Sequence, residues 1–445
     1  MYMWASGTRP RMRVLHAFQY QRGSLVLSHS FTSRPKSSRA QLAWVENAYV
    51  DRPAHSARVL GVELEIMTGQ QKCRVDGLLV DYDPPEWVRD LENVPKCRLK
   101  LVHPDTPIQR WYVPGVPDDF ELYIKRDDMT GSQLSGNKVR KLEFILADAV
   151  SKGCSTIISC GGIQSNHSRA TCISARQLGL KTHLLLKNTE LDPEKVPYQG
   201  NVLLDRLVGA QIHLVPIDAT YGKEIQERAD ILMKKLRDEK GEKPYFVPCG
   251  GSNSLGLFGY VQSFQELLKQ EAPEKFTDIA VAVGSGGTIA GLSMSNYLAK
   301  SNLKIHGMAV GDNAKFFHSE CNRILAGVGW GKRHPTVQSE DLCEIHDGSV
   351  GRGYALSTPE ELEFIFDVAA TTGIILDPVY TGKAAFYLIK MMKERPEAFR
   401  GKKILFIHTG GIFSVFEGRL ESLIQKRRTV NKVDSWANVD DPPEL

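Results

Sequence analysis

The sequence lacks any long apolar run and any block of charge of one sign. Its most apolar stretches, such as "TIISC" and "ILFI", are far shorter than the roughly twenty residues that a helix needs to cross a bilayer. No block of six or more lysines and arginines occurs, and the formal net charge of the 445 residues is only +4. We therefore expect neither a membrane nor a nucleic acid as a partner.

Cysteine is present without a pattern. Eight cysteines are scattered along the chain, with no CxxC pair and no Cys/His spacing of a metal site. Three of them, Cys154, Cys160 and Cys172, fall in or near strand and helix patterns, where cysteine is usually a small core residue. The sequence thus predicts a reducing compartment, and neither a disulfide framework nor a bound metal.

Acidic residues are absent from the first 45 positions, which carry six arginines, one lysine and many serines. This composition is typical of a transit peptide over residues 1–45 and predicts a location in the mitochondrial matrix. A disordered basic tail on a cytoplasmic protein is the alternative. Residues 46–99 combine proline clusters and mixed charge with little periodicity, so we expect an extension of unknown role.

Short apolar segments alternate with helical patterns over most of the remaining chain. A helix is predicted from Lys138 to Ala149, because Leu142, Ile145 and Ala149 repeat on one helical face. Alternation of this kind is typical of parallel sheets covered by helices, so the predicted fold class is α/β. Strands are predicted at "ELYIKRDD", "STIISC", "THLLLK", "QIHLVPI", "PYFVPCGG", "DIAVAV", "KIHGMAV" and "KILFIH".

Four predicted strand ends carry unusual loops, "GGIQSN", "GSGGT", "DPVYTGK" and "HTGG", and ligands bind at such ends in α/β sheets. In the second loop, glycines allow close backbone approach and a helix start favours an anion. A tight turn and a dinucleotide site are alternatives, but the GxGGxxxG spacing is wrong for the latter. We favour the phosphate of a smaller cofactor, bound by Gly284, Ser285, Gly286, Gly287 and Thr288.

Lys138 lies on the apolar face of its helix, although a solvated surface position is the usual alternative for a lysine. Lys141 follows one turn later, and two close ammonium groups lower each other's pKa. A neutral lysine amine can form a Schiff base with a carbonyl cofactor. Pyridoxal 5'-phosphate brings an aldehyde and a phosphate, so it would explain this lysine and the glycine-rich loop together.

Two further pairs of residues lie at predicted loops. Ser165 and Asn166 stand at a helix start, where free amides suit a substrate carboxylate and the Asn side chain could donate to a phenolate oxygen. Helix capping is the alternative for both. Tyr354 and Tyr380 each stand in a probable loop, where a half-buried packing role is the alternative to a functional one.

Six ordered motifs resemble the pyridoxal-phosphate enzymes of the D-cysteine desulfhydrase and 1-aminocyclopropane-1-carboxylate deaminase family: "GNKVRKLEF", "GGIQSNHSRA", "GSGGTIAGL", "GYALSTPEELE", "GIILDPVYTGKA" and "HTGG". The resemblance implies the tryptophan-synthase-β-like fold (fold type II), with two parallel-sheet domains, the cofactor between them, and a homodimer. The expected large domain comprises residues 100–140 and 250–430, the small domain 141–249, and a tail 431–445.

The resemblance also implies roles for single residues toward the cofactor. Lys138 would form the Schiff base, with Lys141 as its basic neighbour. Asn166 would meet the ring oxygen of the cofactor, and residues 284–288 would hold its phosphate.

On the substrate side, the resemblance places Ser165, Tyr354 and Tyr380 against a small amino acid. Family members differ directly after the tyrosine of "DPVY", next to the ring nitrogen: deaminases have an acidic residue there and desulfhydrases have threonine. This chain has Thr381, and His167 also fits the desulfhydrase pattern better. A carboxylate would strengthen the ring as an electron sink, which opening a cyclopropane demands more than expelling a thiolate does.

The expected activity is therefore β-elimination of D-cysteine to hydrogen sulfide, ammonia and pyruvate. Either Lys138 or Tyr380 would remove the α-proton. The alternatives are 1-aminocyclopropane-1-carboxylate deamination, a pyridoxal-phosphate-binding protein without turnover, and a nicotinamide-binding protein built on "GSGGT".

Overall fold

The computed structural model describes residues 75–427, which contain one six-stranded, one four-stranded and one two-stranded sheet. All eight strands predicted from apolar runs are present, and the predicted helix at Lys138 extends to Ser151. The α/β prediction is confirmed. The predictions for residues 1–45 and 431–445 lie outside the described residues. Among residues 75–427, no helix is both long and apolar enough to span a bilayer.

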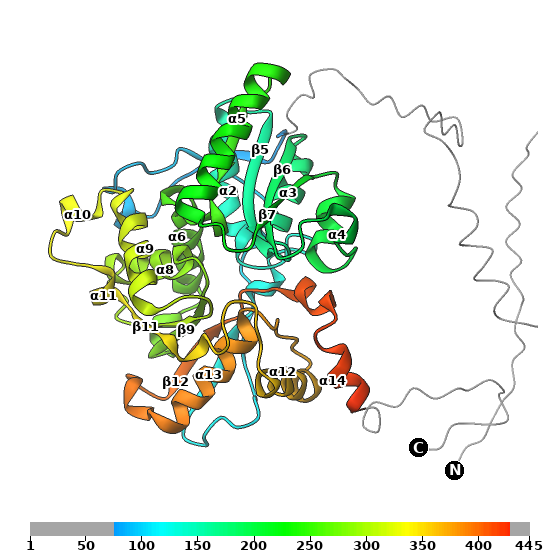
Figure 1. The fold of residues 1–445 in the computed structure, drawn as a ribbon. Helices are drawn as coiled ribbons and strands as arrows, with labels where there is room; N and C mark the ends of the chain where they lie inside the picture. The colour runs from blue at the N-terminus through cyan, green and yellow to red at the C-terminus, as the bar shows by residue number, and fades with distance from the viewer. Residues whose placement is uncertain (1–74, 428–445) are drawn as a thin grey trace, which may run out of the picture. The chain divides into compact units, whose positions relative to one another are not determined.

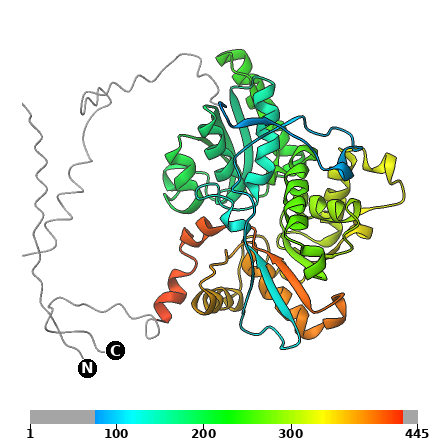
Figure 2. The same ribbon diagram turned by 180° about the vertical axis from the view of Figure 1, so that it is seen from behind.

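The larger sheet is parallel except for one short strand at its edge. Its strand order is β11 (Glu344–His346), β10 (Lys304–Ala309), β9 (Asp278–Val283), β12 (Lys403–Ile407), β4 (Glu121–Lys125) and β3 (Ile108–Arg110), with only β3 antiparallel. Figure 2 shows the cyan strand β4 beside the orange strand β12, although they lie far apart in the chain. Strands β9 and β12 are the two central strands, so the loops after them lie side by side at the carboxyl ends of the parallel strands.

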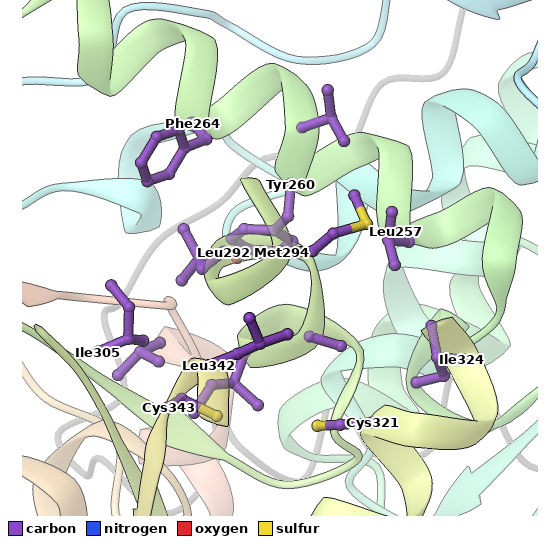
Figure 3. Packing of buried hydrophobic residues seen from close by; sticks show 14 of the residues in the cluster. Leu257, Tyr260, Phe264, Leu292, Met294, Ile305, Cys321, Ile324, Leu342 and Cys343 are labelled. Carbon is purple, nitrogen blue, oxygen red and sulfur yellow. The ribbon is translucent and has the colours of Figure 1, made fainter. Parts of the chain in front are cut away.

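Helices cover both faces of this sheet, which explains why its strands are apolar without alternation. Ile279 and Val281 of β9 pack with α6 (Ser254–Lys269), α8 (Gly287–Leu298) and α9 (Ala314–Ala326). Figure 3 shows this cluster, in which Leu257, Tyr260 and Phe264 of α6 lie near Leu292 and Met294 of α8. The alternate β9 residues, Ala280 and Ala282, pack on the other face with α12 (Pro359–Thr372) and α13 (Thr381–Glu394).

The smaller sheet is wholly parallel, in the order β7 (Gln211–Pro216), β6 (Lys181–Asn188), β5 (Thr156–Gly162) and β8 (Pro244–Val247). One face packs on α2 (Lys138–Ser151), α3 (Asn166–Gln177) and α4 (Gly200–Leu207), and the other on α5 (Gln226–Lys240). Figure 1 shows these elements together at the top of the view. Helix α2 packs against α3 and also against α6, which covers the larger sheet, so α2 links the two sheets.

The described part of the predicted extension is built into the fold. Strand β1 (Leu79–Asp81) pairs with β2 (Cys97–Leu99), and Leu99 is fully buried in the core around α2. Arg98 forms an ion pair with Glu143 of α2, 2.9 Å from nitrogen to oxygen. The division into large and small domains at residues 140 and 250 stays a prediction.

The remaining elements are short. They are η1 (Glu86–Val88), η2 (Asp127–Met129), η3 (Pro193–Lys195), η4 (Tyr221–Ile225), η5 (Cys249–Gly251), α7 (Ala272–Lys275), α10 (Trp330–Arg333), α11 (Ser339–Leu342), η6 (Asp347–Ser349), η7 (Pro396–Ala398), η8 (Ile412–Glu417) and α14 (Glu421–Lys426).

Candidate active site

One pocket lies where the ends of β9 and β12 meet the starts of α2, α3 and α8. The predicted site residues that line it are Lys138, Asn166, Gly284, Ser285, Gly286, Thr288 and Tyr380. The other residues that line it are Asn137, Ala282, Val283, Ile289, Thr409 and Gly410. Five predicted site residues do not line this pocket: Lys141, Ser165, Gly287, Tyr354 and Thr381.

Lys138 is the first residue of α2 and is placed by the loop before it. The backbone N–H of Asn137 donates to the carbonyl oxygen of Thr409 over 3.0 Å. Gly136 approaches the same carbonyl with φ +103°, and a Cβ there would lie 2.8 Å from that oxygen, so only glycine fits. Burial lowers the pKa of Lys138, which favours the neutral, nucleophilic amine.

A buried ion network fixes α2 directly behind Lys138. Arg140 donates to Asp127 over 2.7 and 2.9 Å and to Glu266 of α6 over 3.0 Å. Lys125 of β4 also donates to Glu266. Burial opposes ionisation of Glu266, but the two cations outweigh it and lower its pKa to about 2. The start of α2 is therefore tied to the larger sheet by buried charges.

Lys141 lies one turn after Lys138 and points behind the glycine-rich loop. Its Nζ donates to the carbonyl oxygen of Gly250 over 3.1 Å and would lie 3.0 Å from a Cβ on Gly287. Burial and then the charge of Lys138 hold its pKa well below the ordinary value. Lys141 can thus support an anion on the loop from behind without itself lining the pocket.

The glycine-rich loop has the geometry of an anion cradle. Gly286 adopts φ +78° and gives α8 no side-chain cap, so the amides of Thr288 and Ile289, which follow Gly287 in that twelve-residue helix, are left for a ligand. Gly284 faces Tyr380, whose Cε1 would lie 2.8 Å from an added Cβ. The hydroxyls of Ser285 and Ser252 are 2.8 Å apart, and Ser252 also accepts from the N–H of Gly287. Any side chain in place of the hydrogen of Gly284 or Gly287 would fill the space of this anion cradle.

Asn166 has a fixed orientation. Its Oδ1 accepts from Nδ2 of Asn201 over 3.0 Å, so its own NH2 group is left to donate. Asn201 is itself fully buried and accepts from Nε of Arg169 over 3.2 Å. Ser165, one residue earlier, uses its Oγ to accept from the N–H of Ser168 over 3.1 Å. Ser165 thus caps α3, the alternative considered for it.

Tyr354 and Tyr380 form a pair. Their hydroxyl oxygens are 2.5 Å apart and their rings meet edge to face. Burial, followed by the charge and hydrogen bond of Tyr354, raises the pKa of Tyr380 well above its ordinary value. Tyr380 lines the pocket, whereas Tyr354 is 42% exposed. The Tyr380 hydroxyl is therefore protonated, and its partner is the hydroxyl of the more exposed Tyr354.

Thr381 does not line the pocket. Its Oγ1 donates to Oδ1 of Asp377 over 2.7 Å and accepts from the Asp377 N–H over 3.0 Å. Asp377 also accepts from the N–H of Tyr380 over 2.8 Å. The threonine exposed to the pocket is Thr409, in the "HTGG" motif after the central strand β12. Thr409 and Gly410 follow a central strand, and this position in the sequence could have identified both as site residues.

This pocket fits a phosphorylated aldehyde. It combines a half-buried lysine with a lowered pKa, a glycine-rich helix start that would be blocked by a Cβ, and a carboxamide with its NH2 group free. Among the described residues that line it, none is acidic. Lys138 would hold the aldehyde, the start of α8 the phosphate, and Asn166 a ring oxygen.

Comparison with known proteins agrees with this geometry. The family model "Pyridoxal-phosphate dependent enzyme" matches residues 99–410. The chain is 45% identical over 343 residues to the mitochondrial bifunctional D-cysteine desulfhydrase/1-aminocyclopropane-1-carboxylate deaminase of Arabidopsis thaliana, covering 76% of this chain and 83% of that protein. It is 34% identical to the D-cysteine desulfhydrase of Klebsiella pneumoniae (strain 342), covering 73% of this chain and 98% of that protein.

Solved structures show the same fold. A crystal structure described as an ACC deaminase homologue matches with a TM-score of 0.64 and 36% identity, covering 74% of this chain and 96% of that one. An O-ureido-L-serine synthase, with a TM-score of 0.50 and 16% identity over 76% of this chain and 95% of that one, shares the fold. The predictions of fold type II and of the cofactor are confirmed. The chain belongs to the pyridoxal-phosphate dependent enzymes, within the family of D-cysteine desulfhydrases and 1-aminocyclopropane-1-carboxylate deaminases.

Proposed function

We propose that the protein catalyses β-elimination of D-cysteine, giving hydrogen sulfide, ammonia and pyruvate. The observation that carries this proposal is the pocket around Lys138, which has a nucleophilic amine, an anion cradle and no carboxylate. Pyridoxal phosphate supplies an aldehyde for the substrate amine and a ring that takes up the electron pair left on Cα. A ring held only by neutral groups is a weaker electron sink, which suits loss of thiolate better than opening of a cyclopropane.

Lys138 has two parts in this proposal. Its neutral amine is the nucleophile that holds the aldehyde before substrate arrives. Once the substrate amine replaces it, the same nitrogen is free to take the proton from Cα. Tyr380 is less suited to that step, because its raised pKa keeps the hydroxyl protonated. Tyr380 instead can donate a proton to the leaving sulfur, with Tyr354 as its partner.

The start of α3 is the proposed site of the substrate carboxylate. Asn166 begins this twelve-residue helix at the pocket, and the first backbone amides of a helix favour an anion. Ser165 contributes by capping the helix and so holding these amides in place.

The proposal is tested by supplying the pure holoenzyme with D-cysteine, L-cysteine and 1-aminocyclopropane-1-carboxylate in parallel. Sulfide and pyruvate from D-cysteine are expected to exceed 2-oxobutyrate from the cyclopropane acid, and Lys138→Ala should abolish both. Predominant 2-oxobutyrate would instead establish the deaminase. No turnover of any of the three, with cofactor bound, would contradict the proposal and leave a protein that only binds the cofactor.

Deamination of the cyclopropane acid is the second candidate activity. The relative from Arabidopsis thaliana is named for both activities, and it is the more similar of the two relatives above. Its name also includes a mitochondrial location, which supports our proposal that residues 1–45 direct this chain to mitochondria.

A homodimer remains a proposal, to be tested by the mass of the holoenzyme in solution.

A further inference from the structure

Three potential metal ligands meet at the edge of the larger sheet, outside the pocket described above. His306 lies on β10 and Glu344 and His346 on the edge strand β11, where His306 is directly opposite Glu344 in the parallel register. Residues two apart on a strand point to the same face, so all three side chains converge. Within residues 75–427, this is the one set of three His, Cys, Asp or Glu side chains whose ligand atoms lie within 4.8 Å of one another.

The separations between these ligand atoms suit one small cation. Nδ1 of His306 is 3.1 Å from Nε2 of His346 and 3.9 Å from Oε2 of Glu344, and the latter two atoms are 3.8 Å apart. A tetrahedral site with bonds of about 2.0–2.2 Å places its ligand atoms about 3.3–3.6 Å apart. Shifts of a few tenths of an ångström would therefore complete three corners of a tetrahedron.

The groups behind His306 orient it as a ligand. Its Nε2 lies 2.8 Å from Oδ1 of Asp278, and both side chains are fully buried. A carboxylate acceptor places the ring proton on Nε2 and leaves the Nδ1 lone pair facing Glu344 and His346. Metal-bound histidines in proteins typically have such a carboxylate on their other nitrogen. Asp278 is in turn held by the backbone N–H groups of Arg400 and Gly401.

Glu344 has one carboxylate oxygen available to a metal, and its side chain is exposed to solvent. Its Oε1 pairs with Lys304 over 2.7 Å, so Oε2 is the oxygen turned toward the two imidazoles. The Glu344 side chain is 48% exposed and lines a surface hollow together with Lys304, Phe399 and Arg400. Of the three ligands, Glu344 is the one that lines this hollow, so a cation would enter past Glu344 and a water molecule would occupy the fourth position.

We propose that His306, Glu344 and His346 bind a divalent transition-metal ion of the zinc type. The ligand set of two imidazoles and one carboxylate favours such an ion over magnesium or calcium, which take oxygen ligands. On binding, the metal replaces the hydrogen bond between the two imidazoles, and the Nε2 proton of His346 moves to Nδ1. The bound ion would join β11 to β10. Its ligand His346 stands at the end of β11, eight residues before Tyr354, and β11 leads into the loop that carries this tyrosine.

Sequence spacing does not reveal this site, because its ligands come from two strands separated by a helical crossover. The prediction of no bound metal rested on the absence of a Cys/His motif within one segment. The proposal is independent of the substrate of the enzyme, since none of the three ligands lines the pocket around Lys138.

The test measures zinc bound to the full-length holoenzyme after chelator treatment, by equilibrium dialysis and metal analysis. Wild type is compared with Glu344→Gln and His346→Gln. His213→Gln is the matched control, because His183 and His213 form another stacked imidazole pair, 3.0 Å between ring nitrogens, outside the three-ligand cluster. We expect wild type and His213→Gln to bind one equivalent more tightly, by at least tenfold, than either ligand variant does.

Cobalt and thermal unfolding provide second readouts. Bound cobalt should give wild type and His213→Gln a visible tetrahedral spectrum that both ligand variants lack, and zinc should raise the melting temperature of the first two only. Equal zinc stoichiometry and affinity in wild type and Glu344→Gln would overturn the proposal, since any metal would then be held elsewhere. If His346→Gln fails to fold, Glu344→Gln still decides, because its side chain is half exposed.

Discussion

Asn201 donates a hydrogen bond to Oδ1 of Asn166 over 3.0 Å and so determines which end of the Asn166 carboxamide faces the pocket. Without this donor, the carboxamide could turn and present an acceptor where the cofactor's ring oxygen needs a donor. Asn201 touches neither the substrate nor the cofactor in our account, and it acts by positioning Asn166.

Asn201→Ala should therefore change the visible spectrum of the holoenzyme and lower kcat by about tenfold, in addition to destabilising the fold by roughly 1–3 kcal/mol, because buried polar groups lose partners. Asn296→Ala is the control, since Asn296 is also buried and holds the backbone of Leu303 over 2.8 and 3.0 Å, away from the pocket. The control should lose stability and keep the spectrum. The same spectrum in both variants would refute a positioning role for Asn201.

Thr381 and Thr409 should separate stability from catalysis. Thr381→Val removes the two hydrogen bonds that the side chain makes with Asp377, so we expect a loss of about 1–3 kcal/mol in unfolding free energy, with the cofactor spectrum unchanged. Thr409→Val alters the pocket itself, and there we expect a changed spectrum and a lower kcat. Chemical denaturation and steady-state sulfide release measure the two quantities. A large spectral change in Thr381→Val alone would show that Thr381, and not Thr409, contacts the cofactor.

The tyrosine pair predicts unequal effects. Tyr380→Phe removes the hydroxyl that lines the pocket, and a lost proton donor typically costs 10²–10⁴-fold in rate. Tyr354→Phe leaves that hydroxyl in place without its partner, so the loss in kcat should stay within about tenfold. Both variants should keep the visible absorbance of the bound cofactor. Equal losses of kcat in the two variants would indicate that the two hydroxyls act as one unit or that Tyr380 does not itself donate the proton.

The buried network behind Lys138 predicts a pH dependence of stability. The pKa of Glu266 falls from its ordinary 4.5 to about 2 in the folded protein. Because this pKa is lowered by folding, the carboxylate stabilises the protein above pH 4.5, by roughly 3 kcal/mol from the size of the shift. This contribution is lost as the pH falls from 4.5 toward 2.

Glu266→Gln should therefore be less stable than wild type at pH 7, and the difference in unfolding free energy should shrink as the pH approaches 3. Glu271→Gln is the control, because Glu271 is a surface residue of the following turn and its pair with Lys275 is exposed. A difference that stays constant from pH 7 to pH 3 would mean that the charge of Glu266 is not what holds α2 in place.

The sequence alone predicts the regular part of the fold well, because buried parallel strands are short apolar runs with a clear signal. It misses β3 and β11, which have three residues each, and β1 and β2, which precede the regular pattern. Strands of this length carry too few positions for any periodicity to be detected.

The site is predictable where a motif follows a strand, as for Lys138 and residues 284–288, and less so where contacts come from distant segments. Asn201 reaches the site only through folding, and nothing in its local sequence separates it from ordinary polar residues, whereas Thr409 lies in the "HTGG" loop after a strand. For Thr381 the cofactor contact stays a prediction, because its hydroxyl donates to Asp377 and the residue does not line the pocket. Hydrogen bonds within a turn compete with such contacts, and the sequence alone does not show which one forms.

We propose that the amine of Lys138, and no other lysine, holds the cofactor aldehyde. Reduction of the holoenzyme with borohydride, followed by proteolysis and mass spectrometry, locates the resulting stable adduct on one lysine. We predict that the phosphopyridoxyl group is found on Lys138 alone, with Lys141, one turn away, unmodified. An adduct on Lys141, or on a lysine outside the pocket, would contradict the account.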